Sequence, residues 1–136
     1  MFVSLCLYFD IIFILYDIIY ISKKEALVLE VLLGTQNREL TLQYLLVFKE
    51  GYAREIASYF DAPLPSIQNQ LKNFENAGLA LSKMRGKTRV YTLNPRYTFL
   101  EEVTALLNKA RAYYKPELKE KFELQRKRPR RVEKPL

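Results

Sequence analysis

Residues 51–95 read GYAREIASYFDAPLPSIQNQLKNFENAGLALSKMRGKTRVYTLNP, and this stretch decides the fold. Its first half contains two short amphipathic patterns at helical spacing, separated by the turn Asp61–Leu64. Gly78 ends the second pattern, because glycine accepts the left-handed conformation common at helix C-termini. Branched and aromatic residues then indicate two strands around a turn at residues 85–87. We therefore expect the order helix, turn, helix and hairpin.

Helical periodicity continues on both sides of this stretch. Helices are expected over residues 25–33, 38–49, 53–60, 65–77, 99–114 and 117–124. Strands are expected over residues 79–84 and 88–93. Ile67, Leu71 and Phe74 are spaced by four and three residues, so they form the buried face of the fourth helix. The expected fold class is mainly α with a small β-hairpin.

The composition excludes several functional classes. The 136 residues carry a net charge of +7, but they include no His and a single Cys, Cys6. A disulfide within the chain and a His/Cys metal site are therefore both excluded. The sequence also lacks a Gly-rich phosphate loop and a nucleophile with a His base, so we expect no enzyme, no catalytic residues, no metal and no cofactor. The basic excess instead indicates a polyanionic partner.

The helix expected over residues 65–77 presents polar side chains opposite its apolar face. Gln and Asn amides pair with N6 and N7 of adenine in the DNA major groove, and Lys reaches guanine or a phosphate. Contacts to double-stranded DNA are therefore expected from Ser66, Gln68, Asn69, Lys72 and Asn73. The alternative interpretation is that these are ordinary solvated side chains.

The expected hairpin is strongly basic. Its cations are Lys83, Arg85, Lys87 and Arg89, with no acidic residue among them. Such a hairpin suits DNA phosphates or a narrow minor groove, although lysines also protect the edge of an ordinary hairpin. Arg54, at the start of the helix over residues 53–60, is expected to hold a further phosphate.

Three segments carry a family resemblance: Arg54–Ala57 (REIA), Gln70–Leu79 (QLKNFENAGL) and Gly86–Pro95 (GKTRVYTLNP). Together they resemble the small ArsR-like winged helix-turn-helix regulators of bacteria or archaea, over roughly residues 27–113. The resemblance implies homodimers that bind double-stranded DNA and repress transcription, with terminal helices forming the dimer. The metal-sensing branch uses Cys, His and Asp ligands, whereas this chain has no His and its Cys6 lies outside the matched region. Metal sensing is therefore not expected.

The helix over residues 99–114 has more apolar residues than one small domain needs. Together with Leu29, Leu32 and Leu33, the segment Phe99–Ala110 is expected to form a two-fold interface. We therefore expect a winged helix-turn-helix with a C-terminal dimerisation helix, and with the resemblance this implies a cytoplasmic, dimeric repressor. The alternatives are a winged-helix adaptor for an enzyme encoded nearby and a membrane-anchored regulator in the inner membrane.

The two ends of the chain differ in composition from the rest. Residues 1–22 form a hydrophobic extension, long enough to span a bilayer. We expect the native chain to begin near Ser22, and the alternatives are a membrane anchor or a helix buried in the dimer. Residues 125–136 read as a basic disordered tail. The expected domains are therefore the extension over residues 1–22, the winged domain over 23–98, the helical dimerisation segment over 99–124 and the tail over 125–136.

Overall fold

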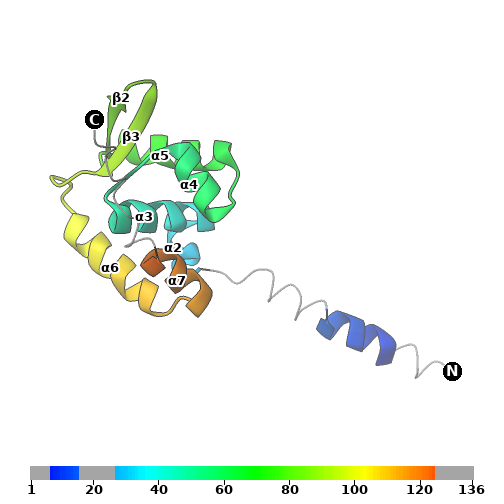
Figure 1. The fold of residues 1–136 in the computed structure, drawn as a ribbon. Coiled ribbons are helices and arrows are strands. Elements are labelled where there is room, and N and C mark those ends of the chain that lie inside the picture. The colour runs from blue at the N-terminus through cyan, green and yellow to red at the C-terminus, as the bar shows by residue number, and fades with distance from the viewer. Residues whose placement is uncertain (1–6, 16–26, 125–136) are drawn as a thin grey trace.

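The computed structural model describes residues 7–15 and 27–124 (Figure 1). The fold is mainly helical with a small three-stranded antiparallel sheet. A helix covers residues 7–15. The further helices are α2 (Glu30–Leu33), α3 (Gln36–Phe48), α4 (Ala53–Phe60), α5 (Leu64–Asn76), α6 (Leu100–Ala112) and α7 (Pro116–Leu124). The strands are β1 (Glu50–Gly51), β2 (Ala80–Arg85) and β3 (Thr88–Leu93).

The helix pair α4–α5 has the expected boundaries to within one residue. Asp61 ends α4 in the left-handed conformation, with φ 52°. Pro63 precedes α5, and Pro65 lies in its first turn, where the missing N–H would have had no helical partner. Gly78 follows α5 with φ +79°, a conformation that favours glycine. Proline and glycine thus place the turn and the helix end as the sequence predicts.

One strand was not expected from the sequence. Residues 50–51 follow the helix predicted over residues 38–49, and they form β1, which pairs with β3 through Glu50 opposite Thr92 and Gly51 opposite Tyr91. The sheet order is β1-β3-β2, and the hairpin β2–β3 stands at one end of the molecule (Figure 1). A two-residue strand has no periodicity of its own, so the pattern that reveals longer strands is missing here.

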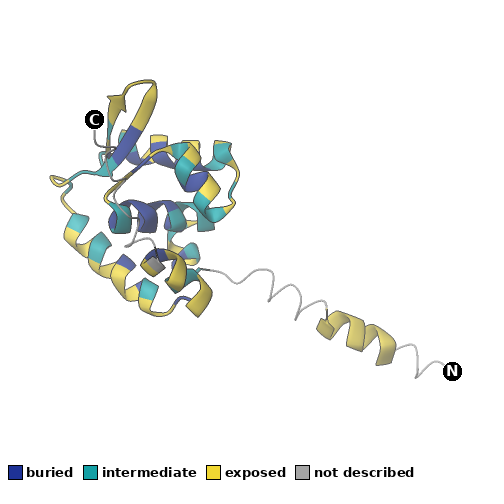
Figure 2. Ribbon diagram, viewed as in Figure 1, coloured by how far each residue is buried: buried dark blue, intermediate teal, exposed yellow. Residues whose placement is uncertain are grey.

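Two apolar clusters meet at α3, whose central residues are buried (Figure 2). One cluster lies between α3, α4 and α5 and contains Leu45, Ile56, Ile67 and Leu71. The other joins α3 to the end of α5 and to the C-terminal helices, through residues that include Leu42, Phe74, Leu107 and Phe122. The predicted buried face of α5 is confirmed. Because residues of α3 belong to both clusters, this helix packs against both α5 and α6.

The leucines near α2 that were predicted to form a two-fold interface differ in their burial within one protomer. The helix predicted over residues 25–33 begins at Glu30, and residues 25–26 lie outside the described part. Leu29 is 4% exposed and lies in the core, so it was wrongly assigned to that interface, whereas Leu32 is 70% exposed. Leu29 and Leu32 differ in burial because Leu29 precedes the short helix and packs in the core.

The predicted apolar side of α6 is also divided. Leu107 and Ala110 are buried in the core, whereas Phe99 and Leu106 are exposed. Phe99 lies at the N-cap position, one residue before α6 begins. A single protomer therefore covers part of this face and leaves large apolar side chains in contact with solvent.

The hydrophobic extension is described only over residues 7–15, whose large apolar side chains are all exposed. In the described part of the chain, no helix has the length and apolar character needed to cross a bilayer. The rest of the segment 1–22 and the basic tail 125–136 lie outside the described residues, as do the predictions made for them.

Candidate nucleic-acid interface

A wide groove lies between α4, α5 and the hairpin β2–β3. Its volume is about 1490 Å³. It brings together five of the ten residues predicted to contact DNA: Arg54, Gln68, Lys72, Lys87 and Arg89. These side chains come from three separate elements, and all five residues are exposed. The fold therefore assembles cations and an amide from distant parts of the sequence around one concave surface.

Hydrogen bonds at the end of β3 fix the hairpin relative to α5. The side-chain amide of Asn94 donates to the carbonyl of Gly78 at 2.8 Å, and its backbone N–H donates to the carbonyl of Leu79 at 2.8 Å. The hydroxyl of Ser82 on β2 also donates to the Glu75 carboxylate near the end of α5. The sequence predicted only that Asn94 would end a strand, because such a tie between elements leaves no local pattern.

The N-terminal part of α5 is held by the first turn of α3. Asn37 Nδ2 donates to Ser66 Oγ at 2.7 Å, and Arg38 Nε donates to Gln70 Oε1 at 2.9 Å. Arg38 also donates through Nη1 to the carbonyl of Leu33 at 2.8 Å. Ser66, predicted to face DNA, is therefore partly buried and already has a protein partner. This hydrogen bond links α5 to α3.

The remaining predicted residues lie beside the groove. Asn69 and Asn73 are exposed on α5, and Lys83 and Arg85 are exposed on β2. None of these four lines the groove, although each neighbours a segment that does. The exposed face of α5 thus extends past the groove. Of the four hairpin cations, Lys87 and Arg89 line the groove, whereas Lys83 and Arg85 lie on β2.

Two acidic residues meet the arginines of the hairpin. Arg85 forms a bidentate ion pair with Glu50 of β1, with Nη1–Oε1 at 2.9 Å and Nη2–Oε2 at 3.0 Å. Arg89 Nη1 lies 3.8 Å from Glu75 Oε2. The sequence of the hairpin itself contains no acid, so these pairs were not foreseen. Both carboxylates come from neighbouring elements that the fold brings alongside.

The Glu50–Arg85 pair changes the proton affinity of both groups. Hydrogen bonding and charge attraction from Arg85 lower the pKa of Glu50, and the reciprocal interactions raise the pKa of Arg85. Both groups therefore stay charged over a wider pH range. Among the described residues, Lys83 and Lys87 make no ion pair, so their charge is available to a ligand.

Tyrosines lie along the groove among the cations. Tyr52 is exposed and Tyr59 is partly buried, whereas Tyr44 and Tyr91 are buried. Tyr59 also packs edge-to-face on Tyr44, with ring centroids 5.4 Å apart. Burial raises the pKa of Tyr59, so its hydroxyl keeps its proton. The tyrosines thus form part of the wall of the groove.

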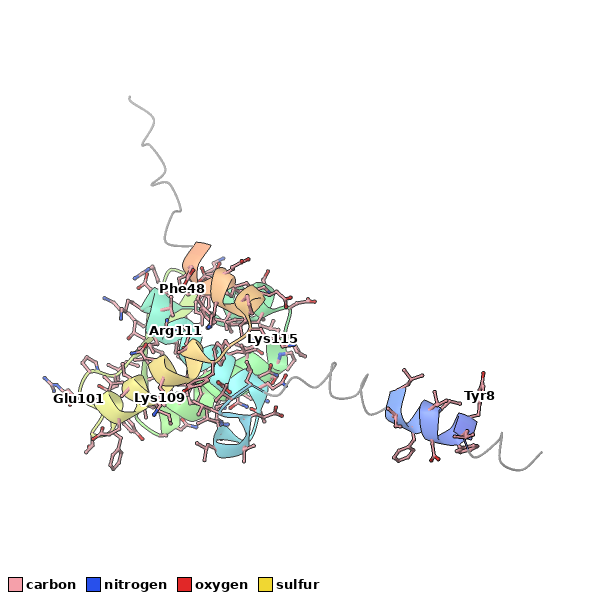
Figure 3. All side chains as sticks on the ribbon, turned by 90° about the horizontal axis from the view of Figure 1, so that it is seen from below. Tyr8, Phe48, Glu101, Lys109, Arg111 and Lys115 are labelled. Carbon is pink, nitrogen blue, oxygen red and sulfur yellow. The ribbon has the colours of Figure 1, made fainter. Side chains whose placement is uncertain are left out.

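A second, smaller hollow of about 450 Å³ lies between α3, α6 and α7. Its lining includes Arg111 and Phe122 but none of the ten predicted residues. Figure 3 shows Lys109 and Arg111 on α6. In residues 7–15 and 27–124, no group of three His, Cys, Asp or Glu side chains is arranged to hold a metal ion. The larger groove is therefore the better candidate for a functional surface.

Comparison of the chain with models of known protein families finds no match. Comparison with curated proteins finds no match either. The chemistry of the groove therefore has to be interpreted from its own residues. Its concave shape, its exposed cations and the exposed row of amides on one helix suit a long, negatively charged ligand with polar edges.

Proposed function

We propose that this protein is a sequence-specific regulator of transcription that binds double-stranded DNA through a winged helix-turn-helix. In this proposal α4 and α5 are the helix-turn-helix, α5 enters the major groove, and the hairpin β2–β3 is the wing. The supporting observation is the groove that brings Arg54, Gln68, Lys72, Lys87 and Arg89 together from three elements. The connectivity of helix, turn, helix and hairpin supports the same assignment.

Each contact class has its own residues in this proposal. Gln68, Asn69 and Asn73 on α5 read base edges, because amides match the donor and acceptor pattern of adenine. Arg54, Lys72 and Lys87 contact phosphates, which position the protein without reading sequence. Ser66 supports α5 through Asn37 instead of contacting DNA. Affinity should come mainly from the cations, and specificity from the amides.

The protein acts as a dimeric repressor in this proposal. Val31 and Leu32 of α2 and Leu106 of α6 are exposed, and a second copy would cover them. The same surface supports a second candidate, in which the chain is a winged-helix adaptor for another protein. The two candidates differ in their ligand, since only the first requires binding to duplex DNA at physiological salt.

Selection from a random duplex library tests the proposal directly. The purified full chain should enrich a near-palindromic sequence, and a labelled duplex of that sequence should bind at least about a thousandfold tighter than unrelated DNA, as specific regulators do. The variant Gln68→Ala/Asn69→Ala should enrich no sequence. Failure of the unaltered chain to enrich any sequence, with only weak salt-sensitive binding, would refute the regulator and leave the adaptor.

A further inference from the structure

Glu50 is exposed on β1 and holds the guanidinium of Arg85, 35 residues later in the chain. Both carboxylate oxygens accept from Arg85, at 2.9 and 3.0 Å, and both side chains are accessible, at 47% and 66% exposed. Arg85 is the last residue of β2, beside the turn of the hairpin. A cation beside the hairpin turn is therefore already paired in the free protein.

The geometry of this pair is the one that a guanidinium also uses for phosphate. Two parallel N–H···O bonds join Arg to a carboxylate or to a phosphodiester in the same way. Nη1 and Nη2 of Arg85 are both engaged by Glu50, so a phosphate that needs this edge has to displace the carboxylate. Until then the carboxylate also cancels most of the field of Arg85 in the surrounding solvent.

The second acid near the hairpin has a different geometry. Glu75 lies 3.8 Å from Arg89 through one nitrogen, and it accepts a hydrogen bond from Ser82 on β2. Glu75 therefore ties the hairpin to α5, and its removal would alter the position of the hairpin as well as its charge. The Glu50 side chain has Arg85 of the same sheet as its partner and makes no bond to α5, and the strand pairing of Glu50 with Thr92 uses the backbone, which Glu50→Gln leaves in place.

We propose that Glu50 limits DNA affinity by competing with phosphate for Arg85. This inference rests on the proposed DNA-binding function. In the free protein Glu50 neutralises Arg85, and on binding the backbone of DNA takes the place of the carboxylate. The effect is independent of base sequence, since phosphates are the same at every site. Glu50 thus weakens binding to unrelated DNA as well as to the preferred site, and it keeps the chain from being held on unrelated duplex.

The test compares Glu50→Gln with a matched charge change elsewhere. Gln keeps the size of the side chain, and the exposed position leaves the core untouched. Glu117→Gln on α7, an exposed glutamate on a helix away from the hairpin, removes the same charge (Figure 1). Binding of the full chain to labelled duplexes, one of the selected sequence and one unrelated, is followed by fluorescence anisotropy over a range of salt concentrations.

Glu50→Gln should bind both duplexes about two- to fivefold more tightly at low salt, the range expected from releasing an exposed ion pair. The slope of log affinity against log salt should steepen by up to about 0.9, because one more phosphate is neutralised. Glu117→Gln should change both quantities less. The double variant Glu50→Gln/Arg85→Gln should lose the gain, since no guanidinium remains to be released.

Three results would overturn the inference. Equal effects of Glu50→Gln and Glu117→Gln would show only a change in net charge. A gain that survives in the double variant would mean that Glu50 repels DNA directly and does not act through Arg85. Either outcome leaves the proposed function intact. If the unaltered chain binds neither duplex, the proposed function fails, and the inference fails with it.

Discussion

The hydroxyl of Tyr114 donates a hydrogen bond to the buried carboxylate of Glu39, 75 residues earlier in the chain. Glu39 also accepts from the backbone N–H of Leu29 at 3.0 Å, and Tyr114 accepts from Gln43 Nε2 at 3.1 Å. The first turns of α3 are thereby joined to the connection between α6 and α7. The neighbouring Asn37 and Arg38 hold α5, so α3 connects the candidate interface to the C-terminal segment.

Removing the hydroxyl of Tyr114 should destabilise the fold. Tyr114→Phe leaves the Glu39 carboxylate with one donor fewer in a site that water does not reach, and an unmet buried polar group costs about 1–3 kcal/mol. Urea unfolding followed by circular dichroism measures the loss. Tyr113→Phe is the matched control, because Tyr113 is 71% exposed and should lose almost nothing. Equal losses in the two variants would contradict a buried network.

The same carboxyl should make stability depend on pH. Burial raises the pKa of Glu39 above 4.5, and the charge of Glu30 acts in the same direction. The folded chain then binds more protons than the unfolded chain at pH values above 4.5. The contribution of Glu39 to stability is therefore fully present below pH 4.5 and is lost as the pH rises through the folded pKa.

Glu39→Gln should remove this decline in stability. The measurement is the urea midpoint over a pH series that extends to both sides of pH 4.5, for the unaltered chain and the variant. Glu50→Gln provides the contrast, because hydrogen bonding from Arg85 lowers the pKa of Glu50. The contribution of Glu50 is present above pH 4.5 and is lost as the pH falls through its folded pKa. If the urea midpoint changes with pH in the same way in the unaltered chain and in Glu39→Gln, the decline does not come from Glu39.

Gly51 should tolerate no side chain. A Cβ at this position would lie 2.6 Å from Cε1 of the buried Tyr44 ring. Tyr44 packs against Phe48 and Tyr59, so the ring cannot move without disturbing both neighbours. Gly51→Ala should therefore cost about 1–3 kcal/mol, as other overpacked core variants do.

The control for this variant is a glycine with free space around it. Gly86 in the hairpin turn has φ +63°, and a Cβ added there would meet no atom within 4 Å. Asn is the residue other than glycine that best tolerates this left-handed conformation. Gly86→Asn should therefore leave the thermal midpoint nearly unchanged. A Gly51→Ala variant as stable as Gly86→Asn would show that the Tyr44 ring yields easily.

The sequence predicted the helices and the hairpin well, because their signals are local. Proline and glycine mark the ends of α5, and the apolar spacing of Ile67, Leu71 and Phe74 gives its buried face. It did not predict β1, whose two residues are too few to show a period. Leu29 was assigned with Leu32 and Leu33 to the two-fold interface, but it is buried in the core of one protomer because it precedes the single-turn helix α2.

The candidate interface was predicted by residue type and less well by geometry. The basic hairpin and the polar face of α5 were evident, but the partners that modify them come from elsewhere in the chain. Glu50 pairs with Arg85, 35 positions away, and Asn37 engages Ser66, 29 positions away. Contacts between residues so far apart in the sequence leave no local pattern, because only the folded chain brings the two residues together.

Base reading by α5 should depend on Gln68 and Asn69. Replacing each with Ala removes an amide that can pair with adenine, at about 1–3 kcal/mol per bidentate contact on the preferred duplex. Affinity for unrelated duplex should stay the same, because phosphate contacts remain. Lys87→Gln gives the opposite signature: weaker binding to both duplexes and a shallower salt slope, by about 0.9. An equal loss of affinity on both duplexes after the amide changes would exclude base reading.

Assembly into a dimer should depend on the apolar side chains that one protomer leaves uncovered. Leu32 on α2 and Leu106 on α6 are exposed, and burying them against a second copy removes apolar surface from water. Leu32→Glu and Leu106→Glu should each shift the full chain toward monomer in sedimentation velocity at micromolar concentration. Leu81→Glu on β2 is the control, because this leucine is also exposed but lies in the hairpin.

The same variants should separate assembly from DNA contact. A dimer places two copies of α5 about 34 Å apart, one turn of DNA, so the preferred site should contain two half-sites. Leu106→Glu should lose affinity for the two-half-site duplex and keep its affinity for a single half-site, because each protomer retains its own groove. If the unaltered chain sediments as a monomer and binds both duplexes equally well, the exposed leucines serve another contact and the regulator binds as a single copy.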